Sequence, residues 1–154
     1  MRRTILLFCL VSAFGQSGAP GRGVLTTFQA ACDKANEGKR LMLEGYLDFP
    51  ERGFGDSDTT VMMRLRPRLA SWEFTVGAKV KIGNGASNVE MPPSNYKKTD
   101  VKLHLADGLV VTYANKVKVS GTMYYVSALG PGEYTCGLNN TLLERGSGWQ
   151  PAPK

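Results

Sequence analysis

The sequence has few of the residues that enzymes and metal sites use for chemistry. It contains one histidine, His104, and three cysteines. It lacks the GxSxG motif of serine hydrolases, the HExxH motif of zinc proteases and a glycine-rich phosphate loop ending in Lys-Ser/Thr. A catalytic triad needs a nucleophile and an acid around its histidine, and no motif places either beside His104. We therefore expect no enzyme, no cofactor and no metal site, and interpret His104 as a surface residue.

The sequence also lacks an apolar run long enough to cross a bilayer, which takes about 20 residues. Residues 5–14 form a shorter apolar stretch that follows Arg2 and Arg3 and ends within the small-x-small site Ala13-Phe14-Gly15. This arrangement predicts a secretory signal peptide over residues 1–15, with a buried N-terminal strand or helix as the alternative. We therefore expect an exported protein, periplasmic or extracellular, with no transmembrane segment in the mature chain. Cleavage removes two arginines and no acid, which lowers the formal net charge from +6 to +4.

Two cysteines, Cys32 and Cys136, remain after the signal peptide is removed. In an exported protein such a pair most simply forms one disulfide. A bridge across about 105 residues stabilises a fold by about 4–5 kcal/mol in the chain-entropy account. Two buried free thiols are the alternative. No CxxC motif and no neighbouring ligand indicates redox or metal chemistry at either cysteine.

The composition favours one domain with many turns. Apolar residues make up 42% of the chain and charged residues 21%, which is typical of a globular protein, and 18 glycines and 8 prolines favour turns over long helices. We predict a flexible leader over residues 16–23, a single domain over residues 24–145 and a disordered tail over residues 146–154. Near the start, Thr26 or Thr27 can cap a short helix that buries Cys32 and ends at Gly38.

Alternating apolar and polar residues predict the strands. They lie at residues 40–49, 59–66, 78–82, 101–105, 109–113 and 116–126, with a last element at residues 135–144. Asp107-Gly108 predicts a hairpin turn, and residues 83–98 predict a long loop. Gly45 and Gly121 occupy the middle of the two clearest strands, where glycine indicates a bulge, a bend or a close backbone approach. We interpret them as paired kinks that curl one sheet.

The two glycine strands also carry a resemblance to a known fold. Leu-x-Leu-x-Gly at residues 41–45 and Val-x-Val-x-Gly at residues 117–121 resemble the first and fourth strands of an OB-fold. With a preceding helix and the closing Cys-Gly-Leu-Asn-Asn at residues 136–140, the chain is similar to small exported bacterial OB-fold proteins, including the loose family called tRNA-anticodon-binding-like. The resemblance covers residues 25–145. It implies a mainly β, small OB-like β-barrel of five to seven strands with a short N-terminal helix, built for ligand binding rather than for a reaction.

One region departs from the OB pattern. An OB-fold usually carries a helix between its third and fourth strands, whereas residues 83–98 are rich in proline and asparagine and do not predict a helix. A simpler barrel or a sandwich is therefore the alternative architecture.

Basic residues form the one constellation that indicates a binding site. Arg64, Arg66 and Arg68 alternate along the outward side of one predicted strand, and Lys79 and Lys81 do the same on the next. If these strands pair, five cations share one exposed face. Trp72 lies between the two strands in the sequence and is included in the candidate site. The alternative is a solvated basic face that keeps the sheet soluble and its edge unpaired.

Three functions follow from these features. The first is an exported, non-catalytic OB-like binding or interaction module whose partner is an anionic glycan, a lipid headgroup or a protein. The second is a single-stranded nucleic-acid-binding OB protein, although such binders place aromatic platforms between their cations and this pattern shows few. The third is a small secreted hydrolase, which would need a cleft that joins His104 to a serine and an aspartate.

Overall fold

The computed structural model describes residues 20–49, 59–69, 74–91, 95, 97–126 and 136–149. The predicted signal peptide, the loop at residues 50–58, Trp72 and residues 150–154 lie outside the described residues.

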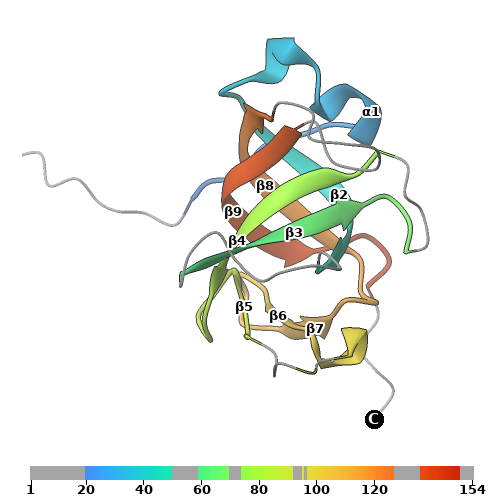
Figure 1. Cartoon of the computed structure of the whole chain (residues 1–154), viewed down its shortest axis with the longest axis vertical. Helices are drawn as coiled ribbons and strands as arrows, with labels where there is room; N and C mark the ends of the chain where they lie inside the picture. Colours follow the sequence, from blue (N-terminus) through green and yellow to red (C-terminus); the bar gives the residue numbers. More distant parts are fainter. Residues whose placement is uncertain are drawn as a thin grey trace, which may run out of the picture.

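Strands dominate the described part of the chain (Figure 1). They are β1 (Val24–Leu25), β2 (Arg40–Asp48), β3 (Thr60–Arg66), β4 (Val76–Ile82), β5 (Asn88–Val89), β6 (Lys102–His104), β7 (Val110–Thr112), β8 (Val117–Tyr125) and β9 (Cys136–Arg145). The helices are α1 (Phe28–Ala31) and two 3₁₀ turns, η1 (Lys34–Asn36) and η2 (Lys98–Asp100). The predicted helix is therefore shorter than its pattern suggested: α1 ends at Ala31, and η1 follows it.

Five of the strands close into a barrel in the order β2, β3, β4, β9, β8 and back to β2. Every neighbouring pair in this ring is antiparallel except β4 and β9, which run parallel. The two strands with central glycines, β2 and β8, pair directly, with Leu41 opposite Gly121 and Gly45 opposite Val117. The predicted fold class, a mainly β small barrel with one short helix near the N-terminus, is confirmed.

Gly45 and Gly121 both lie where the backbone comes too close for a side chain. A Cβ at Gly45 would lie 2.2 Å from the carbonyl oxygen of Arg66 on β3, and one at Gly121 would lie 2.8 Å from Cβ of Leu138 on β9. The ladder between β8 and β9 also shifts register between Ser120 and Thr122. A bulge of this kind increases strand bending and twist, as barrel closure requires.

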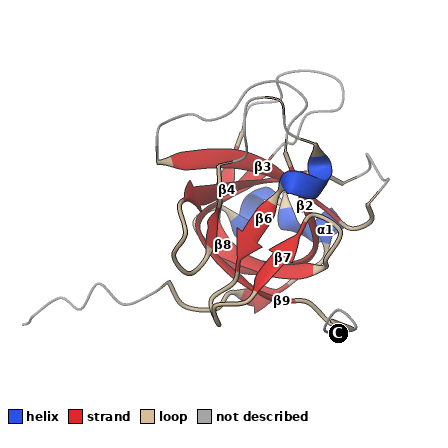
Figure 2. Cartoon of the chain, turned by 90° about the horizontal axis from the view of Figure 1, so that it is seen from below, coloured by secondary structure: helices blue, strands red, loops and turns tan. Residues whose placement is uncertain are grey.

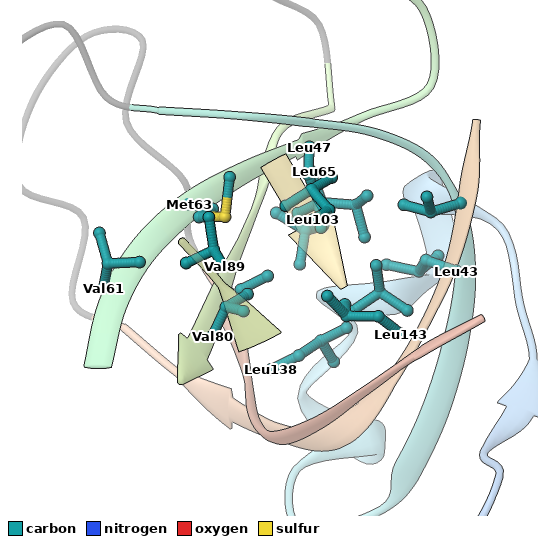
Figure 3. Close-up of a cluster of buried hydrophobic side chains, with 14 of the residues drawn as sticks. Leu43, Leu47, Val61, Met63, Leu65, Val80, Val89, Leu103, Leu138 and Leu143 are labelled. Atoms are coloured by element: carbon teal, nitrogen blue, oxygen red, sulfur yellow. The ribbon is translucent and has the colours of Figure 1, made fainter. Parts of the chain in front are cut away.

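Inward-facing side chains of all five barrel strands fill the interior (Figure 3). They alternate with outward residues, as Leu41, Leu43 and Leu47 do on β2. Burying a leucine fully is worth about 1.5–3 kcal/mol, so this layer of residues is the main source of stability.

The two ends of the barrel are closed by different means. At one end α1 packs against the core (Figure 1). Cys32, which follows α1, forms the predicted disulfide with Cys136 at the start of β9, with a Cα–Cα distance of 5.2 Å. At the other end β5, β6 and β7 lie across the ring of strands, and Val89 and Leu103 point into the core (Figures 2 and 3).

This second closure corrects one prediction. Residues 83–98 are not one continuous loop, because β5 lies within them and pairs with β4 on one side and β6 on the other. The sequence analysis missed β5 because a strand of only two residues shows no alternating pattern. The predicted hairpin is present: β6 and β7 pair around Asp107-Gly108, and Gly108 has φ 83°, a conformation that glycine adopts without strain.

Candidate functional site

The outer surface of β3 and β4 holds the basic residues that the sequence singled out. The two strands pair antiparallel, with Thr60 opposite Lys81, Met62 opposite Lys79 and Arg64 opposite Gly77. Directly opposite residues point to the same side of a sheet. Arg64, Lys79 and Lys81 therefore share the outer side, and Arg68 is exposed just beyond the end of β3. We call Arg64, Arg68, Lys79 and Lys81 the basic face.

Arg66 does not belong to this exposed set. Its side chain is only 4% exposed, and its Nη2 lies 3.5 Å from Oδ2 of Asp48, whose side chain is 10% exposed. The strand pattern placed Arg66 outward and was right about its side of the sheet. It could not show that Asp48, diagonally opposite on β2, pairs with this arginine. Arg66 is therefore part of a buried ion pair. The remaining candidate of the predicted site, Trp72, lies outside the described residues.

An aromatic residue that the sequence analysis did not include reaches the same surface. Tyr124 lies opposite Gly137, Gly137 opposite Gly77, and Gly77 opposite Arg64, so the four residues form one row across β8, β9, β4 and β3. A Cβ added to Gly137 would lie 2.5 Å from Cζ and from the hydroxyl oxygen of Tyr124. The tyrosine side chain therefore lies flat on the glycine instead of standing away from the sheet.

The far end of the same side chain is also fixed. The Tyr124 hydroxyl donates to Sδ of Met62 on β3, at 3.7 Å. Met62 lies beside Lys79, and Arg64 lies two residues further along β3. A half-buried aromatic ring is thus held next to two cations. Gly137 was the available sequence signal, but recognising it required the pairing of β9 with β8.

His104 lies on β6, in one row with Asn88 on β5 and Lys81 on β4. Its Nε2 is 2.8 Å from Oε1 of Glu90, and Nζ of Lys102 is 3.1 Å from Oε2 of the same carboxylate. The hydrogen bond from His104 first, and then that from Lys102, lowers the pKa of Glu90. The side chain of His104 is 13% exposed, less than a surface position suggests. Within the described ranges, Glu90 is the hydrogen-bond partner of this histidine, and no nucleophile contacts it.

Two kinds of feature are absent from the described residues. No group of three or more His, Cys, Asp or Glu side chains among them could hold a metal ion. None of the helices they form is long and apolar enough to cross a membrane.

These features define a small closed β-barrel protein with a basic face and one aromatic ring set beside it. No known protein-family model matches the chain, and no curated protein or solved structure does.

Proposed function

We propose that this protein is an exported, non-catalytic binding module of the OB type that holds an anionic ligand on the basic face. The observation that carries the proposal is the row of Tyr124, Gly137, Gly77 and Arg64, with Lys79 and Lys81 on the adjacent rungs. Cations attract an anionic group, and an aromatic ring lying flat on the sheet offers a stacking surface.

The order of the strands supports the OB assignment. Numbered within the barrel, the strands run 1, 2, 3, 5, 4 and back to 1, with strands 3 and 5 parallel. This is the Greek-key order of an OB barrel, whose ligands commonly bind across strands 2 and 3 and the loops beside them. Here strands 2 and 3 are β3 and β4, the strands of the basic face. The strands β5 to β7 occupy the connection where an OB-fold usually has a helix.

Two features support export. The first is the pattern of residues 1–15, and the second is the Cys32–Cys136 disulfide. Disulfides persist in oxidising compartments such as the periplasm and the cell exterior. Mass analysis of the secreted protein tests this point: removal of residues 1–15 and no uptake of alkylating agent without reduction are expected. Uptake of two equivalents would contradict it.

The ligand class follows from the chemistry of the face. Two acids of the described residues adjoin this face, and cations bind both of them. Asp48 lies opposite Arg64 and pairs with Arg66. Glu90 lies two residues beyond Asn88, which is opposite Lys81, and it is bound by His104 and Lys102. A polyanion would meet the cations of this face and an aromatic ring beside them. Among exported surroundings, an anionic glycan fits both features, because a sugar ring can stack on tyrosine while its carboxylate or sulfate meets Lys79 or Lys81. A lipid headgroup or an acidic protein would use the cations alone.

A binding comparison tests the proposal. Polygalacturonate and heparin represent carboxylated and sulfated glycans, vesicles containing phosphatidylglycerol represent lipid, and neutral dextran is the uncharged control. We expect the double variant Lys79→Gln/Lys81→Gln to weaken glycan binding at least about tenfold. The double variant Lys34→Gln/Lys39→Gln removes the same charge from exposed positions near α1 and should leave binding unchanged. Equal loss in both variants, or equal binding of dextran, would reject the proposal.

Single-stranded nucleic acid is the second candidate, and Tyr124 is the observation in its favour. Base stacking on an aromatic ring, flanked by cations, is the usual mode of sequence-tolerant single-strand binding. Titration with oligo-dT at several salt concentrations separates it from the glycan. The logarithm of affinity should fall with the logarithm of salt by about 0.7 per phosphate contact. Absence of oligo-dT binding at low salt would remove this candidate.

A further inference from the structure

A cavity of about 470 Å³ lies on a different part of the barrel, on the outer surface of β2, β8 and β9. Its lining includes Met42 on β2, Lys118 on β8 and Glu144 on β9, together with Arg22 and Ala106 from segments that cross the barrel surface. It contains none of the residues of the basic face. β8, which contributes Lys118, pairs with β2 and β9 and with neither β3 nor β4.

Hydrogen bonds fix both segments that cross the surface. On one side, the backbone N–H of Gly23 donates to Oγ of Ser120 at 3.0 Å, and Arg22 forms an ion pair with Glu144 at 2.7 Å. On the other side, the N–H of Ala106 donates to the carbonyl of Leu143 at 2.8 Å. The cavity is thus formed before any ligand arrives, which reduces the entropic cost of binding.

The second of these segments has a further tie. Asp107 and Arg145, which also line the cavity, form an ion pair at 2.5 Å. The guanidinium of Arg145 also lies 4.5 Å from the centre of the Trp149 ring. Because Arg145 is committed to these two partners, it is not the group most available to a ligand.

Lys118 differs from the other charged residues of the cavity. Glu44 and Glu144 lie directly opposite it on the two neighbouring strands, where either could pair with it. Instead, Glu44 is bound by Lys116 at 3.2 Å and by Ser147, and Glu144 is bound by Arg22. In the described part of the structure, no ion pair or hydrogen bond involves the Lys118 side chain. The cavity therefore has one surplus cation.

We infer that this cavity binds a small organic monocarboxylate, with the carboxylate on Lys118 and an apolar portion against Met42 and Ala106. One surplus positive charge matches one negative charge. A half-buried ammonium gains more from such a pairing than an exposed one does, because the local dielectric is lower. The apolar contacts favour an organic acid over an inorganic anion.

Hexanoate is a suitable probe, with hexylamine, hexanol and inorganic phosphate as comparisons. Titration of the purified ¹⁵N-labelled protein should give saturable shifts at the amides of Ala106, Lys118 and Glu144. Hexanoate should shift them at concentrations where the other three compounds do not. Shifts that are absent, that lie elsewhere or that are as large with hexylamine or hexanol would overturn the inference.

Variants of Lys118 sharpen the test. Lys118→Gln should raise the dissociation constant for hexanoate at least about tenfold, whereas Lys118→Arg should keep it within a few-fold. Lys34→Gln removes one charge from an exposed turn and should leave it unchanged. Equal affinities of Lys118→Gln and Lys34→Gln would overturn the inference. Thermal unfolding of each variant verifies that it is folded, and the outcome is independent of binding at the basic face.

Discussion

Charge is arranged in opposite ways on two parts of the barrel surface. On the outer surface of β2, β8 and β9, acids and bases alternate from strand to strand. We call this region the mixed face. Glu44, Lys118 and Glu144 lie opposite one another, and each of the two acids has a cation bound to it. On the basic face, Lys79 and Lys81 lie two residues apart on β4. Arg64 lies on β3, opposite Gly77 of β4. The nearby acid Asp48 is buried with Arg66.

The difference indicates which face needs a functional explanation. Opposite charges across a sheet stabilise it by roughly 0.2–1 kcal/mol per pair, and like charges destabilise it. The mixed face therefore follows the arrangement that sheet stability favours. On the basic face, Lys79 and Lys81 lie opposite the neutral residues Met62 and Thr60, and Arg64 lies opposite Asp48. Cross-strand pairing therefore does not account for the two lysines, and we propose that their positive charge serves a ligand. The exception within the mixed face is Lys118, because no ion pair or hydrogen bond in the described part of the structure involves its side chain. For this reason we assign it a separate ligand.

The largest expected effect is on the free energy of unfolding, when the buried Asp48–Arg66 ion pair beside the basic face is broken. Breaking a more exposed ion pair of the mixed face should cost much less. Asp48→Asn leaves Arg66 as a buried cation without the carboxylate, and removing one partner of a buried pair typically costs about 3–5 kcal/mol. Glu144→Gln breaks its pair with Arg22, whose side chain is 76% exposed, and should cost about 1 kcal/mol or less. Urea unfolding of both variants measures the contrast. Similar losses in the two would contradict it.

The next effect concerns the tyrosine beside the basic face. Gly137→Val places atoms where the Tyr124 ring lies and should destabilise the protein by about 1–3 kcal/mol, as overpacking does. Gly21→Ala, at a glycine with nothing within 4 Å of its added Cβ, is the matched control. In a Tyr124→Ala background the cost of Gly137→Val should fall, because the obstructing ring is gone. Denaturant unfolding of the full cycle measures this coupling, and a coupling near zero would mean that the ring does not cover Gly137 in solution.

A smaller effect concerns Glu44 of the mixed face, whose contribution to the stability of the fold depends on pH. Burial alone would raise the pKa of Glu44, but hydrogen bonds from Ser147 and Lys116 outweigh it and lower the pKa below the ordinary 4.5. Glu44 therefore stabilises the fold above that value, and this contribution is lost as the pH falls through the lowered pKa. Glu44→Gln should be less stable than the parent at pH 7 by about 1 kcal/mol or less, and the difference should vanish in acid. Unfolding curves at pH 7 and pH 3 test this, and a difference that persists in acid would exclude the carboxylate as its cause.

The sequence predicted the parts of this protein that depend on local patterning. Alternation along residues 40–49 and 116–126 located β2 and β8, and their central glycines indicated close backbone approach. Alternation also placed Arg64, Lys79 and Lys81 on one side of their strands. The two-residue β5 was missed because so short a strand leaves no periodic signal.

The remaining features depend on register between strands far apart in the chain. Arg66 is buried because Asp48 lies diagonally across the β2–β3 ladder, and no pattern within β3 reveals that. Tyr124 reaches the basic face only because β9 places Gly137 opposite it and Gly77 beside that glycine. Within the predicted tail of residues 146–154, the backbone N–H of Ser147 donates to Glu44 at 2.8 Å, a contact between residues about 100 positions apart. None of these contacts can be predicted from spacing along the sequence, because the pairing of distant strands determines them.

The smallest stability effect is expected for Lys81→Gln, and it sharpens the comparison most directly. Lys81 is exposed on the basic face, and surface substitutions of this kind usually change stability by no more than about 0.5 kcal/mol. If the basic face exists for binding, this variant should lose affinity for polygalacturonate while its urea midpoint stays unchanged. Lys118→Gln should show the reverse selectivity, keeping polygalacturonate and losing hexanoate. A Lys81→Gln variant that loses stability but keeps its affinity would make the basic face structural, and the two faces would then no longer differ in purpose.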